Sequence, residues 1–63
     1  MQNMIDNLTN GNLAAARRQA RRYSLERIAM HCITMLGWTH EKAIAAASYL
    51  KRAGSFQAYC DAE

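Results

Sequence analysis

Residues 24–54 read SLERIAMHCITMLGWTHEKAIAAASYLKRAG and carry the clearest fold signal in the chain, two helical patterns separated by one glycine. In the first pattern, apolar residues recur at the spacing of an α-helix and cover one face: Leu25, Ile28, Ala29, Cys32, Ile33, Met35 and Leu36. The opposite face holds Glu26, Arg27, His31 and Thr34 together with Met30. Ser24 can cap the start of this helix and Gly37 can end it, so we predict a central core helix between them.

The second pattern predicts a helix with a face of small residues. Thr39 supplies an N-cap directly after Trp38, and Gly54 is the expected end of the helix. One side is lined by Ala43, Ala46, Ala47, Leu50 and Ala53. Because small residues let two helix axes approach closely, this alanine face is a candidate packing surface, and it is also a candidate homodimer interface.

Two weaker patterns flank this core. At the N-terminus, a short apolar stripe is formed by Met1, Met4, Ile5 and Leu8. It ends at Gly11, and we expect this first helix to fray or to dock only against the rest. Ser55 can cap a final helical turn, and one side of that turn is formed by Phe56, Tyr59 and Cys60, which predicts a lid on the core. The expected fold is therefore all-α, a compact single domain over residues 1–63 with four to five short helices, whose core is the two helices of residues 24–54.

Length and composition narrow the class of protein further. A chain of 63 residues forms at most one domain and buries only about 60% of its unfolded surface, so a homodimer would add useful stability. No apolar run approaches the ~20 residues that span a bilayer, and the N-terminus has no secretory pattern. Two cysteines do not make a disulfide scaffold. We expect a cytoplasmic protein without a membrane partner.

Positive charge is concentrated in LAAARRQARRYS, residues 13–24. Residues 11–27 hold five arginines and one glutamate, whereas the rest of the chain has a slight excess of acidic residues. Asn12 is a candidate N-cap for a helix here, with an apolar side formed by Leu13, Ala16, Ala20 and Tyr23. At 100° per residue, Arg18, Arg21 and Arg22 lie on the other side and Arg17 lies at the border. A local positive field of this kind indicates a partner.

The arginine face has three interpretations. It could serve solubility, although lysine would do that equally well and this helix contains none. It could bind nucleic acid through phosphates, or it could bind an acidic protein surface. Arginine is preferred where planar contact with phosphate or carboxylate matters, so we favour a binding surface and leave the nature of the anion open. The candidate binding residues are Arg17, Arg18, Arg21, Arg22, Tyr23, Arg27 and Met30.

The sequence offers no pattern for catalysis. It contains no glycine-rich phosphate loop, no nucleophile elbow and no paired carboxylates, so we do not expect an enzyme. The residue types that bind metals are not placed at ligand spacing: His31, Cys32, His40 and Cys60. We therefore predict no catalytic residue, no metal site and no cofactor, and we expect Cys32 to be a core residue.

Two phrases, NGNLAAARRQARRYS at residues 10–24 and YLKRAGSFQAYCDAE at residues 49–63, resemble small uncharacterised accessory proteins of tailed bacteriophages and prophages. The similarity covers nearly the whole chain and contains no catalytic motif. It implies a phage-encoded accessory protein acting in the host cytoplasm. By analogy of context and size, it implies a non-catalytic inhibitor that binds an acidic surface of a host defence protein, as anti-CRISPR proteins do. The alternative is a small DNA- or RNA-binding accessory protein that uses the same arginines.

Overall fold

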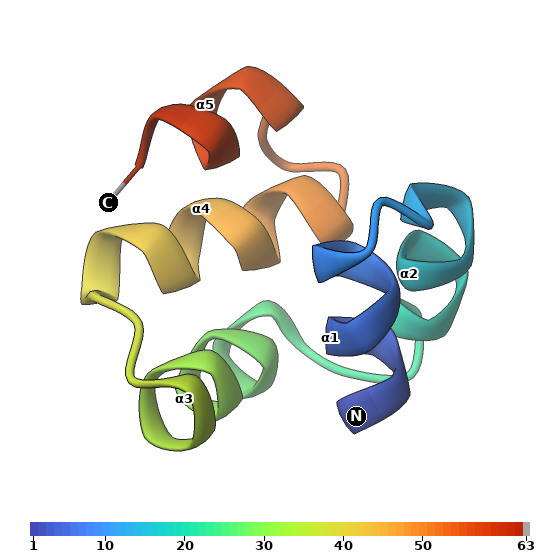
Figure 1. The fold of residues 1–63 in the computed structure, drawn as a ribbon, viewed down its shortest axis with the longest axis horizontal. Helices are drawn as coiled ribbons and strands as arrows, with labels where there is room; N and C mark the ends of the chain where they lie inside the picture. The colour runs from blue at the N-terminus through green and yellow to red at the C-terminus, as the bar shows by residue number, and fades with distance from the viewer. Residues whose placement is uncertain (63) are drawn as a thin grey trace.

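The computed structural model describes residues 1–62 and contains five helices and no strand in that range. Glu63, the last residue of the predicted domain, lies outside the described residues. The helices are α1 (Gln2–Thr9), α2 (Leu13–Ala20), α3 (Leu25–Leu36), α4 (His40–Leu50) and α5 (Phe56–Asp61). In Figure 1, α4 crosses the centre with α3 below it and α5 above it, while α1 and α2 lie together at one side. The all-α prediction is confirmed.

The core is shared more widely than the sequence pattern predicted. Thirteen apolar residues are buried: Met4, Ile5, Leu8, Ala16, Ala20, Ile28, Ala29, Cys32, Ala43, Ala46, Ala47, Tyr49 and Leu50. The predicted N-terminal stripe is confirmed, but the expectation that the core belongs to α3 and α4 alone is wrong. Helix α1 contributes three large buried side chains, and α2 packs mainly against α1 and touches α4 at fewer points.

Three predicted core positions are exposed, in addition to Phe56, which is described below with α5. Met35 is 67% exposed at the edge of the apolar stripe of α3, whereas Cys32 in the same stripe is fully buried. Ala53 is exposed because α4 ends at Leu50, before the helical pattern does. Cys60 is exposed on α5. Helical spacing predicts the direction of a stripe, and the neighbouring helix decides how much of its width is covered.

The alanine face of α4 is used inside the domain. Ala43, Ala46 and Ala47 are fully buried, and α3 is the main neighbour of α4. The face is therefore not free to form a homodimer, and that expectation is corrected. Its small side chains serve the other role predicted for them, which is close packing of two helices within one chain.

Helix α5 packs over α4 through an aromatic cluster, which we define as Trp38, Tyr49, Phe56 and Tyr59. The Tyr49 ring lies 5.3 Å from that of Phe56 and 6.4 Å from that of Tyr59, measured between centroids. The Trp38 ring lies 6.1 Å from that of Tyr59. The predicted lid is confirmed, although Phe56 remains 43% exposed. The sequence pattern did not include Tyr49 among the core residues.

Side-chain caps start the last three helices as predicted. The hydroxyl groups of Ser24, Thr39 and Ser55 each accept a hydrogen bond from the backbone N–H three residues later, at 3.2, 3.2 and 3.0 Å. Asn12 differs, because its side chain makes no cap bond to α2. Its Nδ2 instead donates to Oδ1 of Asn7 at 3.4 Å, so it joins α2 to α1.

At the end of α4, an arginine occupies the left-handed position that glycine occupies at the end of α1. Helices α1 and α4 end with the same pair of backbone hydrogen bonds. At the end of α1, the N–H of Asn12 donates to the carbonyl of Asn7, and the N–H of Gly11 donates to the carbonyl of Leu8. At the end of α4, the N–H of Ala53 donates to the carbonyl of Ser48, and the N–H of Arg52 donates to the carbonyl of Tyr49. This ending needs a left-handed residue, which is Gly11 (φ 85°) in α1 and Arg52 (φ 61°) in α4. Gly54, the predicted stop, serves another purpose, because a Cβ there would lie 3.0 Å from the Cβ of Ser48.

Arg52→Gly is expected to raise the free energy of unfolding by about 1 kcal/mol, because glycine adopts positive φ without the steric penalty that a Cβ brings. Gly11→Ala is the matched control and is expected to lower it by about 1 kcal/mol or more, since a Cβ there meets no neighbour and only φ is strained. Urea unfolding followed by circular dichroism measures both. Changes of the same sign in the two variants would contradict this account of the helix ends.

Candidate functional site

Helix α2 ends at Ala20, earlier than the sequence pattern predicted, so it carries Arg17 and Arg18 while Arg21 and Arg22 lie in the turn that follows it. Helix α2 depends on its neighbours for stability. An eight-residue helix is marginal in water, but Ala16 and Ala20 are fully buried. Asn7 Nδ2 donates to Oε1 of Gln19 at 2.9 Å, and Lys51 Nζ donates to the carbonyl of Ala20 at 3.2 Å. The tertiary structure therefore holds the arginine face in a fixed orientation.

The arginines are not neutralised within the described chain. None of them forms an ion pair with a carboxylate of residues 1–62. Glu26 and Glu41 lie in the first turns of α3 and α4, where the helix dipole favours them. Asp6 and Asp61 accept hydrogen bonds from Gln2 and Gln57. The positive field predicted from the sequence is thus available to a partner.

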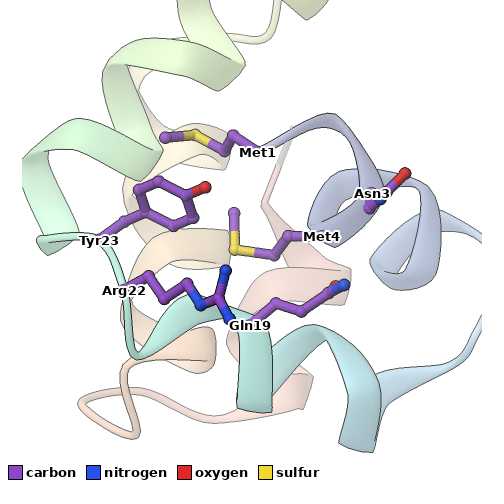
Figure 2. Close-up of a pocket in the computed structure, with 6 residues that line it drawn as sticks. All are labelled: Met1, Asn3, Met4, Gln19, Arg22 and Tyr23. Atoms are coloured by element: carbon purple, nitrogen blue, oxygen red, sulfur yellow. The ribbon is translucent and has the colours of Figure 1, made fainter.

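The structure places the seven candidate residues on two adjoining surfaces, and Arg18 borders both. The first, which we call the ridge, consists of Arg18, Arg22, Tyr23, Arg27 and Met30. Arg18 on α2 and Arg22 in the turn after α2 are both exposed and lie four residues apart in the chain. Arg22 and Tyr23 line a hollow of about 210 Å³ with Met1 and Met4, which Figure 2 shows.

The ridge continues from α2 onto α3. The guanidinium Cζ of Arg27 lies 5.8 Å from the centroid of the Tyr23 ring. Met30, one helical turn beyond Arg27, is 59% exposed, as its position on the polar side predicted. A continuous strip of cationic, aromatic and thioether groups results.

The second surface, which we call the groove, lies between α2 and the turn after α4. A hollow of about 250 Å³ is lined by Arg17, Arg21, Leu50, Lys51 and Arg52. An adjoining hollow of about 220 Å³ is lined by Ala14, Arg17, Arg18, Arg21 and Arg52. Lys51 and Arg52 were not among the residues that the sequence suggested, because only tertiary contact brings them beside α2.

Arg17 has a double role. Its guanidinium Cζ lies 4.2 Å from the centroid of the Tyr49 ring, so it packs on the aromatic cluster. The side chain is half-buried, and its Nε is buried without an acceptor among the described residues. The sequence placed Arg17 at the border of the arginine face, and the structure shows it as the link between the core and the groove.

The remaining reactive groups do not assemble into a site. Burial raises the pKa of the Cys32 thiol to about 11, so Cys32 behaves as a core residue, as predicted. Burial also raises the pKa of Tyr59, with further contributions from the charges of Cys60 and Cys32. His31 was expected on the solvated face but is half-buried, with its Nε2 shielded and unpaired. Within residues 1–62, no three metal-ligating side chains lie together.

Comparison with protein-family models, with curated proteins and with solved structures finds no match for this chain. No helix of the described residues is long and apolar enough to cross a bilayer. The fold and surface therefore define the molecule by themselves as a small all-α domain whose α2 region displays arginines that pair with no carboxylate of residues 1–62.

Proposed function

We propose that this protein is a non-catalytic, phage-encoded inhibitor whose ridge docks on an acidic surface of a host defence protein, in the manner of anti-CRISPR proteins. The observation that carries the proposal is the composition of the ridge. Unpaired arginines are continuous there with Tyr23 and with the exposed Met30. The phage context rests on the sequence resemblance.

The mixture of side chains favours a protein partner over nucleic acid. Arginine, tyrosine and methionine are the residue types enriched in protein interfaces, and arginine and tyrosine often carry much of the binding energy. A surface that only neutralised phosphates would gain nothing from an exposed thioether. Carboxylates on the partner would pair with Arg18, Arg22 and Arg27, while Met30 would fill an apolar hollow between them.

A second candidate function is binding of DNA or RNA. It is favoured by the distribution of charge, because arginines border α2 on both the ridge and the groove. Several phosphates could then be neutralised along one strand, with binding that weakens steeply as salt rises. Against it, the aromatic rings near these arginines are partly or fully buried, so they offer no platform for stacking bases.

The test compares two double variants with equal loss of charge. Arg22→Gln with Arg27→Gln removes two cations from the ridge, and Lys42→Gln with Arg52→Gly removes two from elsewhere. Immobilised protein is exposed to nuclease-treated host lysate. We expect the wild type and the control to retain one stoichiometric protein partner, and the ridge variant to lose at least nine-tenths of it. Circular dichroism checks that both variants are folded.

A parallel titration separates the two candidate functions. Duplex and single-stranded oligonucleotides are added to the wild type at about 50 and 200 mM salt, where phosphate-driven binding differs by orders of magnitude. The inhibitor proposal expects no micromolar binding at either salt. Micromolar binding that collapses at the higher salt, together with no protein partner, would support the nucleic-acid function instead.

A further inference from the structure

We propose that the groove is a second binding site, which takes the dianionic phosphate of a phosphomonoester through Arg17, Arg21 and Arg52. This goes beyond the proposed function, because it uses residues other than the ridge and a different ligand chemistry. The phosphomonoester could be free phosphate or the terminal phosphate of a nucleotide. Both present the same tetrahedral group with several acceptor oxygens.

The first argument is the convergence of like charges. Arg17 on α2 and Arg21 at the C-cap of α2 are four residues apart, and Lys51 and Arg52 approach the same hollow from the turn after α4. No carboxylate lines either part of the groove within the described chain. Cations brought together in this way repel one another, and a bound anion would relieve that repulsion. A carboxylate would balance one of these charges, whereas a phosphomonoester balances about two.

The second argument is the preparation of Arg17. Its guanidinium is held over the Tyr49 ring, which is itself only 5% exposed. Stacking fixes the plane of the guanidinium and removes water from one of its faces. A fork held in this way loses little freedom when it donates two hydrogen bonds to an oxyanion, and partial burial strengthens the attraction. The Nε of Arg17 is buried and has no acceptor among the described residues.

The third argument is the backbone of Arg52. The equivalent left-handed position at the end of α1 is occupied by glycine, whereas α4 places an arginine there at φ 61°. A residue with a Cβ is disfavoured in this conformation, and such strain is concentrated at functional sites. The conformation sets the Arg52 side chain at the groove, where both hollows include it. The chain gives up stability at this position and gains a cation in the site.

The fourth argument is size. Each of the two adjoining hollows, of about 250 and 220 Å³, is smaller than the roughly 300–1,000 Å³ of pockets for drug-sized ligands. The Lys51 ammonium is bound to the Ala20 carbonyl, which fixes its charge at the edge of the groove without filling it. The space suits a phosphate group and leaves the remainder of a larger ligand outside, in solvent.

The test uses the full chain and measures binding by calorimetry and by NMR of the arginine Nε–Hε groups, at pH 8 and low salt. The probes are inorganic phosphate, adenosine monophosphate, acetate, and a short oligonucleotide without terminal phosphate. We expect saturable binding of phosphate and of the monophosphate, at least tenfold tighter than binding of acetate, with the Arg17 signal shifting. Equal affinity for the first two indicates free phosphate as the source, and tighter binding of the monophosphate indicates a nucleotide.

Three variants make the outcome specific to the groove. Arg52→Gly should weaken phosphate binding at least tenfold while stabilising the fold, a combination that damage to the structure cannot produce. Arg17→Lys keeps the charge but loses the planar fork, and should weaken binding similarly. Arg22→Gln removes a ridge cation and should leave phosphate affinity within twofold.

Several results would overturn this inference. Phosphate and acetate of equal affinity would show a nonspecific field, as would an equal loss of binding in Arg22→Gln and Arg52→Gly. Tighter binding of the oligonucleotide than of phosphate would assign the groove to a nucleic-acid backbone. None of these results bears on capture of a protein by the ridge, which the Arg22 and Arg27 variant tests separately.

Discussion

Tyr49→Ala is expected to lower the free energy of unfolding by about 3–5 kcal/mol, the usual range for truncating a large buried aromatic side chain. The Tyr49 ring packs against Phe56 and Tyr59 on one side of the molecule and under the Arg17 guanidinium on another. A domain of this length has about 3–9 kcal/mol of stability in total. The variant should therefore lose a large fraction of the total stability, and α5 should lose its attachment first.

The measurement is urea unfolding at 25 °C, followed by far-ultraviolet circular dichroism and by Trp38 fluorescence, since Trp38 contacts α5 through Tyr59. Tyr49→Phe keeps the ring and is the matched control, with an expected change below about 1 kcal/mol. A loss of less than about 1 kcal/mol in Tyr49→Ala would mean that α5 does not pack on α4 in solution.

Ile5→Ala is expected to lower the free energy of unfolding by about 2–5 kcal/mol. Ile5 is among the largest side chains that are fully buried, and it lies between Met4 and Leu8 on the inner face of α1. Because α2 packs mainly on α1, loss of α1 would also release the arginine helix. The effect should therefore extend to the ridge and the groove.

Asn3→Ala is the matched control on α1, because Asn3 is exposed, and its expected effect is within about 0.5 kcal/mol. The two variants are compared with the wild type by their melting temperatures and by the amide hydrogen exchange rates of α2. If Ile5→Ala has the same melting temperature as Asn3→Ala and leaves the amide hydrogen exchange rates in α2 unchanged, then α1 frays and contributes little to the core.

Much of the fold could be predicted from local chemistry. Ser24, Thr39 and Ser55 cap helices because a hydroxyl placed before a helical pattern satisfies a free backbone N–H wherever the helix later packs. The direction of each apolar stripe is equally local, since it depends on 100° per residue alone. These features survive in any arrangement of the five helices.

The candidate site was predicted only in part. The ridge was accessible to sequence reasoning, because its arginines and Met30 lie on the outer sides of two adjacent helical patterns. The groove was not, because Lys51 and Arg52 are separated from Arg17 by more than thirty positions in the chain. One local indication of the groove is present in the sequence. The left-handed position at the end of α4 is occupied by Arg52, and the first glycine comes two residues later, at Gly54.

By itself, the sequence determined the helical class, the three side-chain caps and the charge of α2, since each depends on neighbours within about four residues. The tertiary structure alone decided that α1 belongs to the core, that Tyr49 is buried under Arg17, and that the alanine face of α4 is consumed within one chain. It also decided which arginines form the ridge and which form the groove. The physical reason is that burial and the meeting of charges depend on which helices pack together, and helical periodicity carries no information about the partner of a face.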